Sequence, residues 1–140
     1  MSIAVYQFTR TKEFILGGGV RLATDTLKMA LLAPGFKYTD RMVSFNDIQA
    51  LEVAPTLHYQ KGGIVIPGAD VITSGTKAEF RIGDVAFEQL DTTVSNLVIY
   101  ADITAYNIDK PLICYGVFPT DLVFKLSTLR LSWPNPLISW

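Results

Sequence analysis

Charge is scarce in this sequence. Only 18% of its 140 residues are lysine, arginine, aspartate or glutamate, whereas a soluble domain usually has about 25%. The 12 basic and 13 acidic side chains leave a formal net charge of -1, which excludes a nucleic-acid reader that works through a basic surface. The hydrophobic fraction of 49% excludes intrinsic disorder. We therefore expect one folded domain with no direct nucleic-acid binding.

Cysteine and histidine are nearly absent. Cys114 is the only cysteine and lies in an apolar stretch, so we expect no internal disulfide and a small buried side chain. His58 is the only histidine, and no Gly-x-Ser-x-Gly motif is present. One histidine and one cysteine cannot make an ordinary zinc site without carboxylates. We therefore expect no enzyme, no catalytic residue, no metal site and no cofactor.

Long hydrophobic runs are also missing. No run approaches the roughly 18 apolar residues that a membrane helix needs, and the first residues lack the basic start and apolar stretch of a secretory signal. We therefore expect no membrane contact and synthesis in a reducing cytoplasm.

Short β-strands dominate the pattern after residue 19. Apolar and polar side chains alternate with period two at residues 77–82 and 97–103. The apolar phase switches between residues 122–126 and 129–133, which predicts a turn or bulge at residues 127–128. Seven or eight such strands predict an all-β fold, a single antiparallel β-sandwich that is jelly-roll-like or immunoglobulin-like.

Two segments have a helical pattern instead. Residues 45–53 predict one or two helical turns, with Ser44 or Asn46 as the N-cap. The first 19 residues predict a short helix or arm that ends at a glycine-rich joint, residues 17–19. That joint lacks the spacing of a phosphate-binding loop and follows the helix, so it predicts a stop and a flexible connection. We divide the chain into residues 1–19, the helix or arm, and residues 20–140, the β-sandwich domain.

Both ends of the chain carry apolar residues outside the expected sandwich. At the C-terminal end, Trp133 and Trp140 flank a proline-stiffened segment. Since chain ends are usually polar and frayed, this end predicts docking, either on its own domain or on a partner. The candidate assembly contacts are Val5, Phe8, Phe14, Ile15, Leu16, Leu137, Ile138 and Trp140.

Seven short motifs follow one another in a familiar order. They are residues 25–32 (DTLKMALL), 38–40 (YTD), 45–48 (FNDI), 59–63 (YQKGG), 84–87 (DVAF), 111–115 (PLICY) and 131–134 (LSWP). Together they span most of residues 20–140, and the chain resembles small virion structural proteins of tailed bacteriophages, of the head decoration or cement type.

The resemblance implies a role in the virion. It implies a capsid decoration or cement protein, on the capsid surface, that binds and stabilises the shell of the major capsid protein. It also implies a homo-oligomer, with a trimer favoured, made in the host cytoplasm and without catalytic residues. On this view, the shortage of charge reflects surface that is covered in an assembly.

Two other functions stay open at this point. The protein could instead be a tail, connector or head-fibre component, which copy number and position in the particle would separate from a cement protein. From another class, a carbohydrate-binding β-sandwich would need exposed aromatic rings, for which the candidates are Tyr59, Tyr100 and Tyr106.

Overall fold

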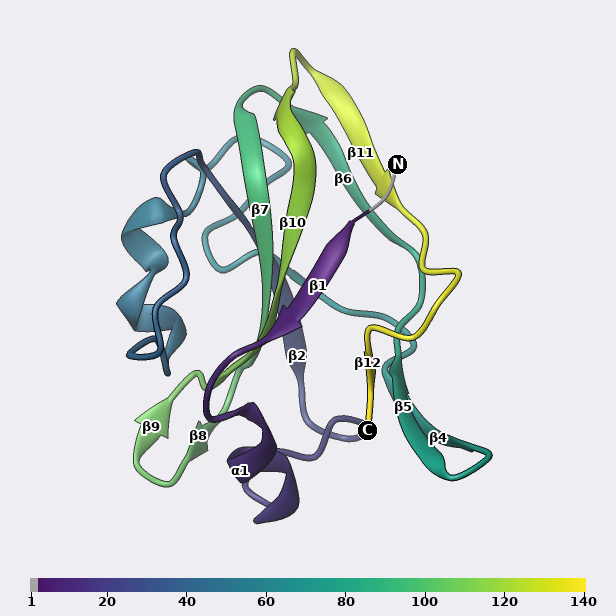
Figure 1. Ribbon diagram of the computed structural model, residues 1–140. Coiled ribbons are helices and arrows are strands. Elements are labelled where there is room, and N and C mark those ends of the chain that lie inside the picture. Colours follow the sequence, from purple (N-terminus) through teal and green to yellow (C-terminus); the bar gives the residue numbers. More distant parts are fainter. Residues whose placement is uncertain (1–2) are drawn as a thin grey trace.

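The computed structural model describes residues 3–140 as a mostly β structure with one α-helix (Figure 1). The strands are β1 (Ala4–Gln7), β2 (Leu27–Leu32), β3 (Ile64–Val65), β4 (Asp70–Ser74), β5 (Lys77–Arg81), β6 (Val85–Leu90), β7 (Thr93–Ala101), β8 (Thr104–Ala105), β9 (Ile108–Asp109), β10 (Leu112–Val123), β11 (Ser127–Leu131) and β12 (Ile138–Ser139). The helix is α1 (Thr11–Leu16), and two 3-10 turns are η1 (Phe45–Asp47) and η2 (Gln49–Leu51). The predicted all-β, sandwich-like fold class is confirmed.

The strands form one large sheet and three small ones. The large sheet has the order β1-β10-β7-β2-β3, and the small sheets are β11-β6, β12-β5-β4 and β8-β9. All of these pairings are antiparallel. In Figure 1 the long strands β7 and β10 run side by side, with β5 and β4 set off at one corner of the molecule.

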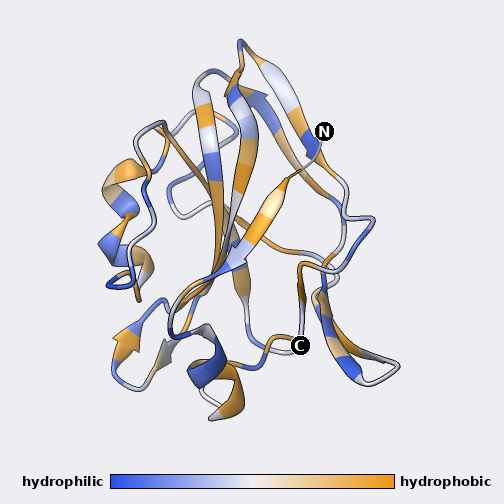
Figure 2. Cartoon of the chain, in the orientation of Figure 1, coloured by the Kyte–Doolittle hydropathy of each residue, from blue (hydrophilic) through white to orange (hydrophobic). Residues whose placement is uncertain are grey.

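The large sheet is covered on both faces. Successive side chains of a strand point to opposite faces, and in β7 the stretch 96–101 is buried throughout. Leu97 and Ile99 belong to the larger hydrophobic cluster, which includes residues of the small sheets. Val98 and Tyr100 belong to a second cluster, completed by the segment that carries η1 and η2. Figure 2 shows hydrophobic residues along β10 and on this covering segment.

The N-terminal segment differs from its prediction. The sequence predicts Val5 in a helix or arm, but it lies in β1, opposite Gly116 of β10. The reason is long-range strand pairing. Exposed and half-buried side chains alternate along β1, as in a strand, and β1 completes the large sheet by pairing with β10. The helix is restricted to α1, and its predicted end at Gly17 is confirmed.

Three local predictions are confirmed. The Ser44 side chain accepts a hydrogen bond from the Asn46 N–H and caps η1, while the Asp47 carboxylate accepts from the Ser44 N–H at 3.0 Å. The pairing of β11 with β6 shifts register between Ser127 and Leu129, close to the predicted bulge. The C-terminal segment docks on its own domain, because β12 pairs with β5.

A buried carboxylate joins the covering segment to the large sheet. The Tyr59 hydroxyl donates to Glu52 Oε2 at 2.7 Å and accepts from the Leu31 N–H at 3.0 Å, and the Gly62 N–H also donates to Glu52 Oε2. Burial and the nearby Glu52 carboxylate raise the pKa of Tyr59, so its hydroxyl stays protonated and keeps donating. The carboxylate therefore has the partners that a buried charge needs.

Gly63 is required by the close approach of two backbones. Its φ is +81°, and an added Cβ would overlap the carbonyl of Met29 in β2. Gly75, in the β4–β5 turn, also has a positive φ, +62°, but an added Cβ would have no neighbour within 4 Å. A comparison of substitutions at the two positions therefore separates the effect of steric overlap from the effect of backbone strain.

We expect Gly63→Ala to lower the free energy of unfolding by about 3 kcal/mol or more, because overlap adds to strain. Gly75→Ala should cost only about 1–2 kcal/mol, from strain alone. Urea unfolding followed by tryptophan fluorescence measures both values. Equal losses in the two variants would contradict the close approach of Gly63 to β2.

Candidate functional site

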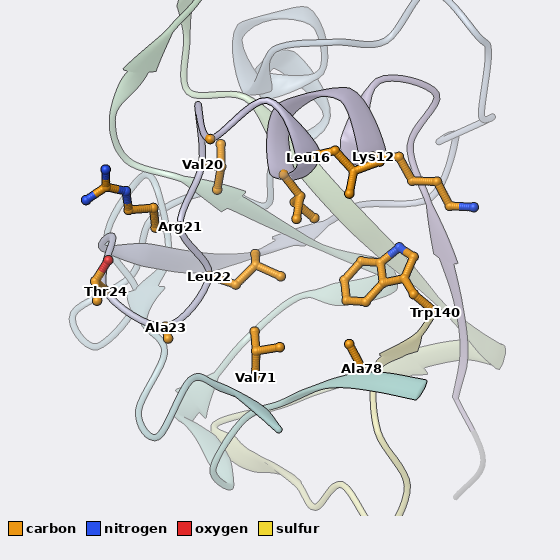
Figure 3. A pocket seen from close by; sticks show the side chains of 12 residues that line it. Lys12, Leu16, Val20, Arg21, Leu22, Ala23, Thr24, Val71, Ala78 and Trp140 are labelled. Atoms are coloured by element: carbon orange, nitrogen blue, oxygen red, sulfur yellow. The ribbon is translucent and has the colours of Figure 1, made fainter. Parts of the chain in front are cut away.

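An open apolar groove of about 590 Å³ lies on the surface between α1, the loop that follows it, the β4–β5 hairpin and the C-terminal residue (Figure 3). Its apolar lining includes Leu16, Val20, Leu22, Val71, Ala78 and Trp140. We call this feature the apolar groove. It is larger and more apolar than two further surface cavities of the described residues, one beside Trp133 and one beside Phe45.

Helix α1 forms one wall of the apolar groove. Phe14 is fully buried and anchors the helix, whereas Leu16 is 85% exposed. The helix ends where the Gly17 N–H donates to the Glu13 carbonyl at 3.0 Å, and the chain then returns so that the Val20 N–H reaches the Phe14 carbonyl. This return places Val20 beside Leu16 at the groove, as Figure 3 shows.

The glycine run lies against Tyr106. The Tyr106 ring stacks on Phe14, with ring centroids 5.9 Å apart, and a Cβ on Gly19 would come within 2.8 Å of the same ring. The sequence predicted a flexible joint at residues 17–19. Gly17 and Gly19 have a second role in the structure, because a side chain at either position would push the Tyr106 ring away.

The opposite wall comes from the β12-β5-β4 sheet. The Trp140 N–H donates to the Ala78 carbonyl at 2.9 Å, which extends the pairing of β12 with β5 to the last residue. Ala78 pairs with Thr73 and Phe80 pairs with Val71, so these side chains share one face with Trp140. Figure 3 shows Val71, Ala78 and the Trp140 indole along this wall.

A tight turn closes one end of the apolar groove. The Arg21 N–H donates to Asp25 Oδ2 at 2.7 Å, and the Asp25 N–H donates to the Arg21 carbonyl at 2.8 Å. These two bonds hold the turn that buries Leu22 at the base of the groove.

The charged residues that line the apolar groove are both basic. Lys12 and Arg21 belong to the lining, and no aspartate or glutamate does. Figure 3 shows their charged ends directed away from the centre, toward opposite ends of the groove. The groove therefore offers hydrophobic contact along its length and a positive charge at each end, which is a binding surface rather than a set of reactive groups.

The eight predicted contacts separate into three groups. Ile15, Leu16 and Trp140 come together at the apolar groove. Val5 lies elsewhere, at a cavity of about 140 Å³ beside the C-terminal segment. The remaining four are buried in the protein's own core: Phe8, Phe14, Leu137 and Ile138.

Sequence reasoning missed the middle of the groove. The alternating pattern of residues 77–82 predicts only a strand position for Ala78, and the sequence places Val20, Leu22 and Val71 in the sandwich domain without a role. In the sequence, these four residues stand out only by their apolar character, Val20 and Leu22 after the glycine run and Val71 and Ala78 in a short hairpin. That signal does not tell which face of a strand meets the helix.

The tyrosines expected for carbohydrate binding are mostly inside. Tyr59 and Tyr100 are buried, and only Tyr106 is exposed, at 49%. Instead, exposed aromatic rings gather where Tyr6 and Tyr38 flank Tyr115, with ring centroids 5.4 and 5.3 Å away. These rings border the second hydrophobic cluster, which Tyr115 packs against.

Other expectations concern chemistry and membranes. Within residues 3–140, no group of three or more histidine, cysteine, aspartate or glutamate side chains is placed to hold a metal ion. His58 is exposed, in the segment between η2 and β3. No helix in the described part of the chain has the length and apolar character needed to cross a membrane.

Comparisons with known proteins give no relative. No protein-family model, no curated protein and no solved structure matches the chain. The function of the apolar groove is therefore argued from its own residues and from the sequence.

We expect the Cys114 thiol to be unreactive in the folded protein. Complete burial raises its pKa to about 12, so at pH 8 the thiol stays protonated, whereas the thiolate is the nucleophile. Iodoacetamide followed by mass spectrometry should show no modification at pH 8 without denaturant and full modification in denaturant. As a control, Leu57→Cys places a thiol at a residue that is 90% exposed and should react at once. Rapid modification of folded wild-type protein would contradict the buried position.

Proposed function

We propose that the protein is a virion structural protein of a tailed bacteriophage, a capsid decoration or cement protein that holds the major capsid protein through its apolar groove. The observation that carries this proposal is Leu16, which is 85% exposed at the edge of a groove whose lining is otherwise mostly apolar. A large exposed apolar surface with polar edges is typical of an interaction site.

Hydrophobic burial supplies the binding free energy in this proposal. Covering a leucine side chain fully contributes about 1.5–3 kcal/mol, and Ile15, Val71 and Trp140 add further partly covered apolar surface. Lys12 and Arg21 favour a partner segment that is apolar in the middle and acidic at its ends. Such a segment on the capsid shell would fit the groove in both apolar character and charge.

The sequence motifs support the same proposal from another direction. The motif at residues 25–32 contains β2, the motif at 84–87 begins β6, and the motif at 111–115 begins β10. The resemblance to decoration proteins is therefore carried by the strands that build the core. The residues that line the groove all lie outside these motifs, and they would set the choice of partner.

Two alternatives use the same fold differently. A tail, connector or head-fibre component would present the groove to a different virion protein. Cryo-electron microscopy of particles separates the two, because a cement protein follows the capsid lattice and a tail component does not. A carbohydrate-binding role is less supported, since two of its three expected tyrosines are buried.

We expect Leu16→Glu to weaken binding to capsid shells about tenfold or more, the equivalent of losing at least one buried leucine contact. The matched control is Leu57→Glu, which changes a leucine that is equally exposed, at 90%, and lies outside the groove. Sedimentation of labelled protein with shells of the phage that carries this sequence measures both affinities.

Thermal unfolding of the two variants checks that neither substitution disturbs the fold. Wild-type binding by Leu16→Glu would overturn the role of the groove. Failure of the wild-type protein itself to bind shells would overturn the decoration function.

A further inference from the structure

Strand β4 is exposed on both faces and along one edge. All five of its residues are exposed, with Val71 and Ile72 at 40% each. In its sheet, β4 is the outermost strand and pairs only with β5. Figure 1 shows the β4–β5 hairpin projecting from the body of the molecule. An edge of this kind can accept another strand.

The backbone groups on the free edge follow from the hydrogen bonds of β5. Ala78 exchanges hydrogen bonds with Trp140, and the Phe80 carbonyl accepts from the Leu137 N–H, so these two β5 residues face β12. Because backbone groups alternate along an antiparallel strand, their partners in β4, Val71 and Thr73, direct their N–H and C=O groups away from β5.

One of these edge groups has a local partner. The Val71 N–H donates to Asp70 Oδ1 at 2.8 Å. For the Val71 carbonyl and for both backbone groups of Thr73, the described residues provide no hydrogen-bond partner. The edge is thus only partly protected.

The edges of the large sheet are formed by shorter strands, of four residues in β1 and two in β3. Strand β1 alternates exposed and half-buried residues, and Val5 shares a small cavity with the C-terminal segment. Strand β3, at the other edge, has only two residues. Strand β4 also lacks lysine, proline and glycine, which natural proteins use to block edge pairing, and its centre is Val-Ile-Thr, which favours strand pairing.

We propose that two copies of this chain pair through β4, antiparallel, about a two-fold axis at Ile72. In this register Val71 of each copy lies opposite Thr73 of the other, and the two Ile72 residues face each other. Each Val71–Thr73 pair then exchanges two backbone hydrogen bonds. The two three-stranded sheets become one continuous sheet of the order β12-β5-β4 followed by its symmetry mate.

The charges and faces agree with this register. Asp70 lies opposite Ser74 of the other copy, whose neighbour on β5 is Lys77. The acidic residue at each end is therefore set between its own Arg81 and a lysine of the other copy, and no like charges meet directly. Val71 stays on the face of the apolar groove, so each groove face continues onto the second copy.

A cysteine at the two-fold axis tests the register. In Ile72→Cys the two new residues form a non-hydrogen-bonded pair with Cα atoms about 4.5 Å apart, which a disulfide can span. Mild oxidation should convert this variant to a covalent dimer of twice 15.5 kDa that reductant returns to monomer. The buried Cys114 does not compete.

The matched control is Val71→Cys, on the same strand and equally exposed. Its two copies are diagonal neighbours, about 7–8 Å apart, which is too far for a disulfide. Equal crosslinking of both variants would overturn the register.

Sedimentation equilibrium of the wild-type protein tests the pairing without a crosslink. We expect the molar mass to rise from 15.5 kDa toward twice that value with concentration. Ile72→Lys, which places two like charges opposite each other, should remain at 15.5 kDa. A wild-type monomer at all concentrations, or an oligomer that Ile72→Lys leaves intact, would overturn the proposal. Leu16→Glu should keep the dimer, so failure of shell binding and failure of dimerisation are told apart.

Discussion

Strand β7 has to be covered on both of its faces, and the rest of the fold serves that requirement. It pairs with β2 on one side and β10 on the other. Its side chains point alternately to the two faces of the sheet and enter two separate hydrophobic clusters. The small sheets cover one face, and the segment with η1 and η2 covers the other. The hydrogen bond between Tyr59 and the buried Glu52 fixes that segment to β2, because a buried carboxylate would be costly without its donors.

The two-sided sheet gives a second physical reason for the shortage of charge. A strand with one face in water alternates apolar and polar residues, whereas a strand buried on both faces is apolar at successive positions. Residues 97–101 and 112–114 are all buried, so none of these positions faces water and none carries a charged side chain. Among the large apolar side chains that remain exposed are Leu16 beside the apolar groove and Val71 and Ile72 of strand β4.

The β4–β5 hairpin links the two proposed contacts. Its inner face supplies Val71 and Ala78 to the apolar groove through side chains, while its outer edge offers backbone groups of Val71 and Thr73. Side-chain contact selects a partner by shape and apolar character, whereas edge pairing depends on backbone hydrogen bonds and accepts many sequences. One short hairpin can therefore serve a specific contact with a shell and a symmetric contact with a second copy.

Local signals in the sequence determined the β-rich class, the Ser44 cap, the register shift near Ser127 and the end of the helix at Gly17, because caps, turns and period-two alternation depend on neighbouring residues. The sequence also marked Leu16 and Trp140 as unusual. Only the tertiary structure decided that Val5 joins a sheet, that Phe14 and Ile138 are core residues, and that Leu16 and Trp140 meet Val71 in one groove. The reason is that the apolar character of a residue only indicates that its burial is favourable. Long-range strand pairing decides whether other residues of the same chain bury it.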